Sequence, residues 1–311
     1  MAIDRVVALV GGVGGAKLAF GLAQSLPPEC LTIIVNTGDD FWNFGLRVCP
    51  DLDTIMYTLS GLVDKINGWG VAHDSTQMLA AMKRYGEDAW FRLGDQDLAT
   101  HILRTHLLRE GWSLTAVTRR LASALGIGQT ILPMTDDPVA TMVDTAEYGE
   151  LDFQTYFVRY RWQPTIRNMR LDGIEPAAMT DAVRSALADA DTIIIGPSNP
   201  WLSIDPILSV PGMREAIKAR AVPRVAVTPI VAGAAVKGPA AKIMAELGYN
   251  VSPETVVDFY GDVLNGFVYD ERDASIQADH LHTIAFDTIM TGDVEKQLLA
   301  QKILDWIGNW S

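Results

Sequence analysis

Short apolar runs recur along the chain, separated by polar or glycine-rich segments. Their length and unbroken apolar character are typical of strands buried on both faces. These runs are residues 6–10, 31–35, 129–133, 191–195, 224–227 and 266–269. A further segment, 151–161, alternates apolar and polar residues and predicts a strand with one solvated face.

Apolar residues at helical spacing occupy the intervals between these strands. The predicted helices are 17–25, 52–59, 78–82, 98–107, 113–126, 176–188, 211–219, 239–247, 253–264 and 294–307. Strands that alternate with helices form parallel sheets covered on both faces. We therefore predict an α/β fold with a Rossmann-like, doubly wound, mainly parallel sheet.

One long stretch interrupts the alternation. From Asp51 to about Leu125 the strand signal disappears and helical spacing replaces it. We expect a Rossmann-like nucleotide-binding core, residues 1–48 and 127–311, with a helical insertion, residues 49–126, after the second strand. Such insertions commonly cover the carboxyl ends of the strands, where ligands bind.

Composition narrows the partners. The net charge of −13, with no basic stripe, argues against nucleic acid. No apolar run approaches the roughly 20 residues that span a bilayer. The chain enters a strand almost at once, and Cys30 and Cys49 show neither metal-ligand spacing nor a disulfide framework. We expect a cytoplasmic protein that binds small molecules.

A glycine-rich stretch, residues 11–17, joins the first predicted strand to the first predicted helix. Amides of Gly12, Gly14 and Gly15 can face a phosphate there, and the helix dipole favours negative charge. Lys17 replaces the third glycine of the G-x-G-x-x-G dinucleotide fingerprint, and the Gly-Lys-Ser/Thr of a Walker loop is missing. The stretch is either a phosphate cradle of neither standard kind or a tight turn without a ligand.

Polar residues follow the other predicted strands. Those of interest are Asn36, Thr37, Asp40, Thr135, Asp136, Ser198 and Asn199. Because the carboxyl ends of parallel strands share one edge, these residues can converge on a nucleotide or phospho-ester. Each also has an ordinary interpretation, since Asp-Asp-Pro and Ser-Asn-Pro are good turns and Asn36 can cap a helix.

Carboxylates open two of the predicted helices. Asp51 and Asp53, alone or together with Asp40, can hold Mg²⁺ against a diphosphate, or can simply favour the helix dipole. Asp97 can act as an N-cap, and His101 one turn later is a ligand contact or a packed core histidine.

In their order and combination these motifs resemble the 2-phospho-L-lactate transferase family of coenzyme F-420 biosynthesis over essentially the full length. The motifs that carry the resemblance are 11–17, 35–40, 45–54, 93–101, 132–137 and 196–200, with weaker support from 267–273 and 288–290. The resemblance implies a Mg²⁺-dependent homodimer. Its reaction would move a phospho-lactyl, phosphoenolpyruvyl or phosphoglyceryl group from a guanosine diphosphate ester to the ribitol hydroxyl of the deazaflavin Fo, releasing GMP and forming F-420-0 or its dehydro form.

The resemblance and the residue chemistry together give expected roles. Catalysis is expected from Asp51, Asp53 and Lys17, and metal binding from Asp40, Asp51 and Asp53. The donor nucleotide is expected at Gly12, Gly14, Gly15, Asn36, Thr37, Thr135, Asp136, Ser198 and Asn199. The acceptor is expected beside Asp97 and His101, with Trp69, Trp90 or Phe91 as stacking partners or core residues.

One position departs from the family pattern, because Gln96 stands where the family usually has arginine, and Arg92 or Arg104 can substitute for that charge. Two other functions compete: a non-catalytic nucleotide-sugar-binding regulator related to the gluconeogenesis-factor family, and a nicotinamide-dependent oxidoreductase. The broken dinucleotide fingerprint counts against the oxidoreductase. The identity of the transferred three-carbon acid is not marked by any residue.

Overall fold

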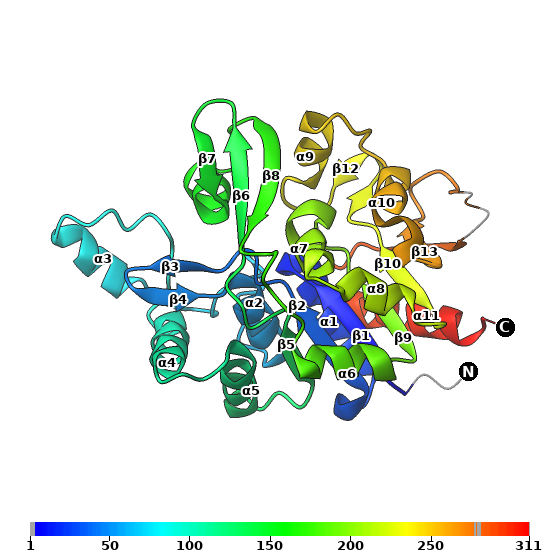
Figure 1. Ribbon diagram of the computed structural model, residues 1–311, viewed down its shortest axis with the longest axis horizontal. Helices are drawn as coiled ribbons and strands as arrows, with labels where there is room; N and C mark the ends of the chain where they lie inside the picture. Colours follow the sequence, from blue (N-terminus) through cyan, green and yellow to red (C-terminus); the bar gives the residue numbers. More distant parts are fainter. Residues whose placement is uncertain (1–3, 277, 279–280, 311) are drawn as a thin grey trace.

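A seven-stranded, all-parallel sheet forms the centre of the computed structural model, which describes residues 4–276, 278 and 281–310. Its strand order is β5-β2-β1-β9-β10-β13-β14 (Figure 1). The strands are β1 (Val6–Val10), β2 (Leu31–Val35), β5 (Thr130–Pro133), β9 (Thr192–Ile195), β10 (Arg224–Val227), β13 (Gly266–Asp270) and β14 (His282–Phe286). The order reverses between β1 and β9, which confirms the predicted Rossmann-like fold and places its switch point there.

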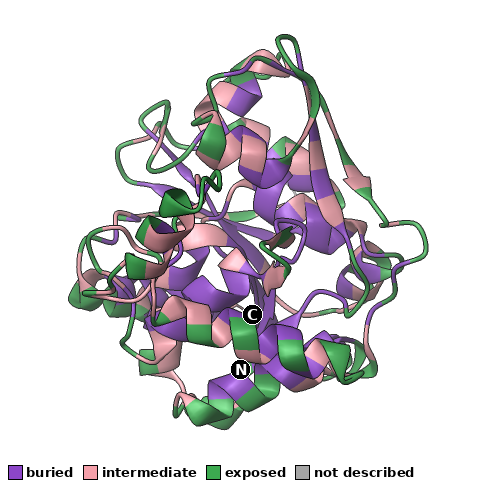
Figure 2. Cartoon of the chain, turned by 90° about the vertical axis from the view of Figure 1, so that its left-hand side faces the viewer, coloured by how far each residue is buried: buried purple, intermediate pink, exposed green. Residues whose placement is uncertain are grey.

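Helices cover both faces of this sheet. In β1, Val6, Ala8 and Val10 face one layer, while Val7 and Leu9 face the other, as strand alternation requires. The first layer contains α1 (Gly12–Ser25), α2 (Pro50–Leu59), α5 (Leu114–Ala124) and α11 (Asp293–Gly308). The second contains α6 (Asp181–Asp189), α7 (Asp205–Ser209), α8 (Met213–Lys218), α9 (Ala240–Glu246) and α10 (Pro253–Tyr260). Buried residues accordingly concentrate along the sheet and the inner helix faces (Figure 2).

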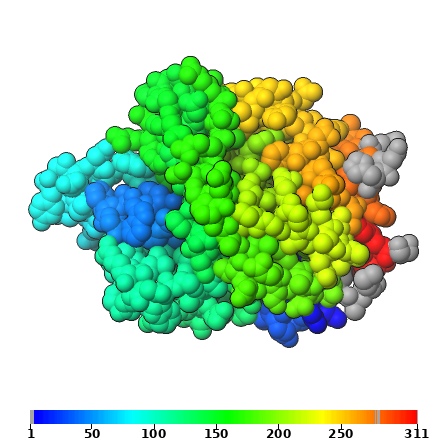
Figure 3. Space-filling view, in the orientation of Figure 1, coloured from blue at the N-terminus to red at the C-terminus, as the bar shows by residue number. Residues whose placement is uncertain are grey.

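Four helices lie between β2 and β5, where the helical insertion is predicted. They are α2, α3 (Gln77–Arg84), α4 (Asp97–Arg109) and α5, of which α2 and α5 pack on the sheet in the first layer, and a short hairpin of β3 (Phe41–Asn43) and β4 (Leu46–Val48) precedes them. The α3 segment and this hairpin extend from the left side of the core (Figures 1 and 3). None of the helices in the described part of the chain is long and apolar enough to cross a membrane.

Residues 151–161 are not the strand that their alternation predicts. Strand β7 (Gly149–Asp152) ends at Asp152, whose carboxylate accepts hydrogen bonds from the backbone N–H and hydroxyl of Thr155, at 2.9 and 2.6 Å. A π-helical turn, Thr155–Arg159, follows and buries Tyr156. A side chain that caps a helical turn has overridden the period-two pattern. Strand β7 instead pairs antiparallel with β6 (Ala140–Thr145), which also pairs with β8 (Ile166–Asp172).

Several further boundaries differ from those predicted. Helix α1 begins at Gly12, so the glycines lie in its first turn and not in a preceding loop. Helix α6 begins at Asp181, after Thr180 caps it through the backbone N–H of Val183. The remaining short elements are β11 (Ile230–Val231), β12 (Ala234–Ala235), the 3-10 turns Pro28–Cys30 and Gly261–Val263, and the π-helical turn Pro200–Ile204.

Candidate functional site

The loops that leave β1 and β9 touch at the switch point. The Gly11 backbone N–H donates to Ser198 Oγ at 3.1 Å, and that hydroxyl donates to the Gly11 carbonyl at 2.8 Å. A Cβ atom on Gly14 would lie 2.3 Å from the Pro197 carbonyl oxygen, and one on Gly15 would lie 2.5 Å from Ser198 Oγ. Glycine is therefore required at both positions, because the first turn of α1 packs directly on the loop after β9.

Asp51 connects three of the predicted site residues. Gly12, at φ +62°, donates its backbone N–H to Asp51 Oδ1 at 2.8 Å. Asn36 donates its Nδ2 to Asp51 Oδ2 at 3.0 Å, while its Oδ1 accepts from the Gly38 N–H at 2.8 Å. Helix α1 has neither a side-chain cap nor an acidic residue in its first turn. Asp51 thus supplies, from α2, the negative charge at this helix end.

A second buried carboxylate, that of Asp39, lies close enough to Asp51 for the two charges to interact. Asp39 is buried, and its Oδ1 has no hydrogen-bond partner among the described residues, as is also true of Thr37 Oγ1. Burial and the nearby charge of Asp51 raise the pKa of Asp39 well above its ordinary value. Burial also raises the pKa of Asp51 to about 6. Two buried, mutually repelling carboxylates, of which Asp39 has an oxygen without a hydrogen-bond partner among the described residues, fit a hard divalent cation, which prefers oxygen ligands.

Asp40 lies next to this pair and interacts with an arginine. Its Oδ2 is 3.3 Å from Arg47 Nη2, and its Oδ1 is buried without a hydrogen-bond partner in the described structure. Burial raises the pKa of Asp40 to about 6, although Arg47 opposes that shift. Asp40 can therefore exchange a proton near neutral pH.

Asp53 faces a different neighbour from Asp51. Two residues apart on a helix, their side chains point in directions about 200° apart. Asp53 contacts α4, where Arg104 donates to both of its carboxylate oxygens, with Nη1 at 3.1 Å from Oδ2. The Arg104 side chain is 1% exposed, so this is a buried ion pair. The metal site predicted from Asp40, Asp51 and Asp53 would need Asp53 to leave this arginine.

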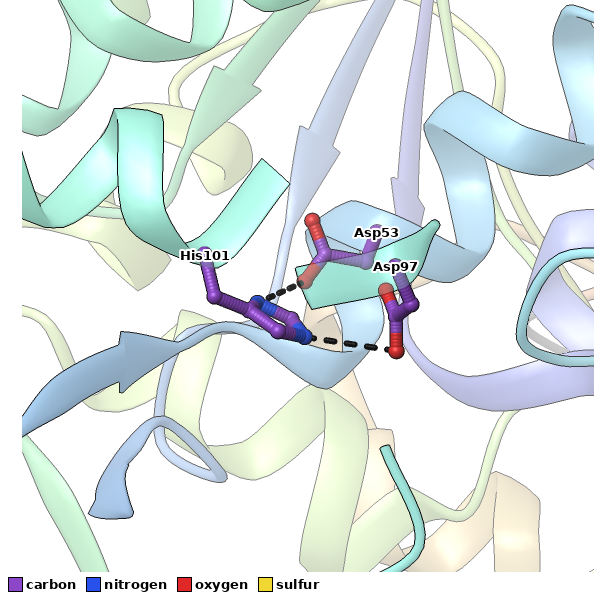
Figure 4. Close-up of side chains that lie close together, drawn as sticks. All are labelled: Asp53, Asp97 and His101. Carbon is purple, nitrogen blue, oxygen red and sulfur yellow. Dashed lines mark ion pairs between the residues drawn. The ribbon is translucent and has the colours of Figure 1, made fainter. Parts of the chain in front are cut away.

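His101 joins Asp53 to Asp97 (Figure 4). Its Nδ1 is 3.6 Å from Asp53 Oδ2, and its Nε2 is 3.3 Å from Asp97 Oδ2. Tyr57 donates its hydroxyl to Asp97 Oδ1 at 2.6 Å. Ligand atoms of Asp53, Asp97 and His101 lie within 4.8 Å of one another, a spacing that suits a metal ion. The guanidinium of Arg104, paired with Asp53, already supplies a positive charge to this group, and a cation bound there would lie next to it.

Lys17 points away from the aspartates. Its Nζ donates to the Met290 carbonyl at 2.6 Å, at the start of α11. Burial, then the positive charges of Lys296 and Lys237, lower the pKa of Lys17. The predicted phosphate-binding lysine therefore belongs to a cluster of lysines and is not beside Asp51.

Three other predicted residues make local structural contacts. Thr135 donates its hydroxyl to the Ala178 carbonyl at 2.8 Å. Asp136 accepts from the backbone N–H and hydroxyl of Thr115, at 2.6 and 2.8 Å. Asn199 Oδ1 caps the Pro200–Ile204 turn, while its Nδ2 is buried without a partner among the described residues. These contacts match the ordinary turn and helix-cap roles that the sequence also allows for these residues.

The sequence does not indicate Arg47, Tyr57 or the two lysines near Lys17, which are Lys237 and Lys296. It indicates Arg104 only as a replacement for the charge missing at Gln96. The spacing of residues 97, 101 and 104 places all three on one face of a helix, and this signal could have identified the Asp97–His101–Arg104 row.

The switch point of this Rossmann-like sheet brings together a glycine-rich helix end and buried carboxylates. This arrangement is typical of α/β proteins that bind a ligand at the carboxyl ends of their strands. Comparison with known proteins identifies the group more closely. The chain belongs to the 2-phospho-L-lactate transferase CofD family, whose model matches residues 6–302. It is therefore a member of a transferase family of coenzyme F420 biosynthesis.

Relatives share this chain's full extent. A 2-phospho-L-lactate transferase of Methanosarcina mazei is 42% identical, covering 94% of this chain and 97% of its own. A phosphoenolpyruvate transferase of Streptomyces griseus is 40% identical, covering 97% and 98%. A crystal structure of a UPF0052 family protein from Bacillus halodurans aligns with a TM-score of 0.65 at 16% identity, covering 98% of this chain and 99% of its own. That last likeness concerns the fold alone.

Proposed function

We propose that the protein transfers a phospho-lactyl, phosphoenolpyruvyl or phosphoglyceryl group from a guanosine diphosphate ester to the ribitol hydroxyl of Fo. The products are GMP and F-420-0 or its dehydro form. The observation that carries the proposal is the Asp51 carboxylate, which is held between the Gly12 N–H and Asn36 at the switch point of a CofD family chain.

Mg²⁺ is proposed at Asp39 and Asp51, with Asp40 beside them. The support is the chemistry of the donor set: carboxylate oxygens, two of them free of hydrogen bonds, in a buried position where their pKa values are raised. When bound, the ion would neutralise diphosphate charge. Asp53 is assigned to positioning, because its oxygens are engaged by Arg104.

The chain's own residues would position the reaction. The hydroxyl oxygen of Fo attacks the phosphorus that bears the three-carbon acid, and the bond from that phosphorus to the GMP oxygen breaks. Asp40 is the proposed proton acceptor, because its pKa of about 6 and its free Oδ1 suit a base near neutral pH. The transfer depends chiefly on orientation and charge stabilisation.

The acceptor wall is proposed on the helical insertion. Phe91 packs edge-to-face against both Phe41 and Trp90, with ring centroids 4.7 and 5.6 Å apart. Trp69 is 41% exposed, and the Arg92 guanidinium lies 5.8 Å from its ring centroid. An exposed indole beside a cation suits a flat deazaflavin and an anionic neighbour. Arg92 is thus the proposed replacement for the arginine missing at Gln96.

The experiment is direct. Purified protein, Fo and Mg²⁺ are incubated with each guanylated donor, and GMP and the conjugate are measured by mass spectrometry. We expect both products with at least one donor, and no product from Asp51→Asn. The exposed control Asp189→Asn should retain full turnover. Binding of the guanylated donors without GMP release would support the regulator instead.

We also propose a homodimer, from the family resemblance, and a cytoplasmic location, from the cysteine usage of the chain. Light scattering on the purified protein would test the first, since a dimer has twice the mass of the chain. Fractionation of the producing cells would test the second.

A further inference from the structure

A cavity of about 130 Å³ lies between the start of α1, the end of α2 and the start of α11. Val13 and Lys17 line it from α1, Thr58 lines it from α2, and Lys296 lines it from α11. Val63 and Lys65, in the segment that follows α2, also line the cavity. Helices α1 and α11 meet closely beside it, because a Cβ atom on Gly21 would lie 2.0 Å from the Lys296 carbonyl oxygen.

Positive charge dominates this cavity. Lys65 and Lys296 share one carboxylate, with their Nζ atoms 2.7 and 2.8 Å from the two oxygens of Asp293. Lys17 forms no ion pair with any described residue and donates only to the Met290 carbonyl. Three ammonium groups facing one carboxylate stand out in a chain whose net charge is −13. Burial and then the positive charge of Lys296 lower the pKa of Lys17, which shows that the two ammonium groups repel each other. An anion would relieve this repulsion.

Size restricts what the cavity can hold. Pockets for nucleoside-sized or drug-sized ligands are roughly 300–1,000 Å³, so this smaller volume matches a smaller ligand better than guanosine or a deazaflavin. A small organic acid does. Val13 and Val63 offer apolar surface, and Thr58 offers a hydroxyl, beside the ammonium groups. The lining therefore suits a short carbon skeleton that carries more than one negative charge.

We propose that this cavity binds the phosphorylated three-carbon acid of the donor, with its carboxylate on Lys17, Lys65 and Lys296 and its carbon-3 substituent against Thr58 and Val63. The assignment rests on the proposed function and deepens it, because it names the residues that distinguish lactyl, enolpyruvyl and glyceryl groups. Gly12 contacts Asp51 and the next residue, Val13, lines the cavity. A diphosphate at the first turn of α1 can therefore reach both.

Binding of the detached acid is the first test. Phosphoenolpyruvate and 2-phospho-L-lactate are titrated calorimetrically, with inorganic phosphate and L-lactate as fragments. We expect the phospho-acids to bind more tightly than either fragment. Lys296→Met should weaken them about tenfold, the loss of one charge-assisted contact. Lys65→Met, whose side chain is 70% exposed, should weaken them about threefold without a risk to folding. Lys302→Met, on the same helix but over Phe286, is the matched control and should change nothing.

Donor competition is the second test. With the three guanylated donors in one mixture, Val63→Leu should reduce the glyceryl product about tenfold relative to the enolpyruvyl product, because one added methylene narrows the cavity. Val236→Leu, at an exposed valine, should leave the ratio unchanged.

The outcomes separate the two proposals. Lysine-dependent binding of phospho-acids without any turnover would overturn the transferase function and keep the cavity assignment. Turnover with unaltered donor KM in Lys65→Met and Lys296→Met would overturn the cavity assignment and keep the function. Phosphate alone binding as tightly as the phospho-acids would also overturn it, since the cavity would then recognise no acid.

Discussion

Residue by residue, the site depends on where each carboxylate finds a partner. Asp51 has two fixed donors, Asp53 has an arginine, and Asp39 Oδ1 has no partner in the described structure. A buried charge that has no oppositely charged or hydrogen-bonding partner destabilises the fold, and such charges are typical of functional sites. This difference in partners decides what each substitution should do.

Asp39→Asn should stabilise the metal-free protein and abolish turnover. Removing one of two repelling buried charges should raise the free energy of unfolding by about 1–3 kcal/mol. Urea denaturation at pH 7.5 in EDTA, with the exposed Asp189→Asn as control, measures the gain. A stability equal to or below that of the unchanged protein would remove Asp39 from the proposed pair.

The gain from Asp39→Asn should depend on pH with a definite sign. A carboxyl whose folded-state pKa is raised carries its full penalty above that pKa, and the pKa of Asp39 is raised well above its ordinary value of 3.8. As pH falls from the raised pKa towards the ordinary value, the folded protein takes up the proton and the penalty disappears. The difference in unfolding free energy between variant and parent should therefore be largest at neutral and higher pH and should shrink as pH falls towards the ordinary pKa. A difference that is constant over this range would contradict the pKa assignment.

Asp53→Asn should lose both stability and turnover. The change leaves the buried Arg104 guanidinium without its carboxylate, at a cost of about 3–5 kcal/mol. The double variant with Arg104→Met should recover part of the stability but not the turnover, because Arg104 also orients His101, whose Nδ1 is 3.2 Å from Nη1. Thermal denaturation and the GMP assay, run on the same samples, separate the two effects.

At the scale of elements, the close contact between α1 and the loop after β9 sets the shape of the switch point. Gly14→Ala should cost about 1–3 kcal/mol, because its methyl group would overlap the Pro197 carbonyl. Gly308→Ala, near the end of α11, brings its Cβ within 4 Å of no other element among the described residues and should be neutral or slightly stabilising. Equal unfolding free energies for the two variants would show that this contact can relax.

Some elements could be predicted from the sequence and others could not, for a physical reason. Strands buried on both faces, such as 31–35 and 191–195, are read from their apolar runs alone. Strands β8 and β14 are mostly solvated, so their sequences carry little apolar signal. Residues 151–161 carried a strand pattern that the cap at Asp152 overrode. A fully buried strand can be recognised from its unbroken apolar residues, whereas a partly exposed strand lacks that pattern.

The same distinction applies to the site. Gly12, Asn36 and Asp51 could be predicted to converge, because each lies at a strand or helix end on one edge of a parallel sheet. The separation of Asp53 from Asp51, and the orientation of Lys17 towards α11, could not. Both features depend on which helices pack against each other, and helix packing partners cannot be identified from the sequence.

For the whole molecule, a ligand that binds only the folded state should raise global stability in proportion to its occupancy. Mg²⁺ at one hundred times its dissociation constant adds about 2.7 kcal/mol. For a chain of 311 residues that corresponds to a rise in Tm of roughly 4 °C. Asp51→Asn should abolish the rise, while Asp189→Asn should retain it.

Because a divalent cation neutralises the charges that Asp39→Asn removes, the stabilising effect of that substitution should also decline as Mg²⁺ is added. A Mg²⁺-induced rise in Tm that Asp51→Asn leaves unchanged would place the ion elsewhere in this acidic molecule. Since Asp53→Asn tests the other candidate group, the same scan assigns the ion to one of the two carboxylate clusters.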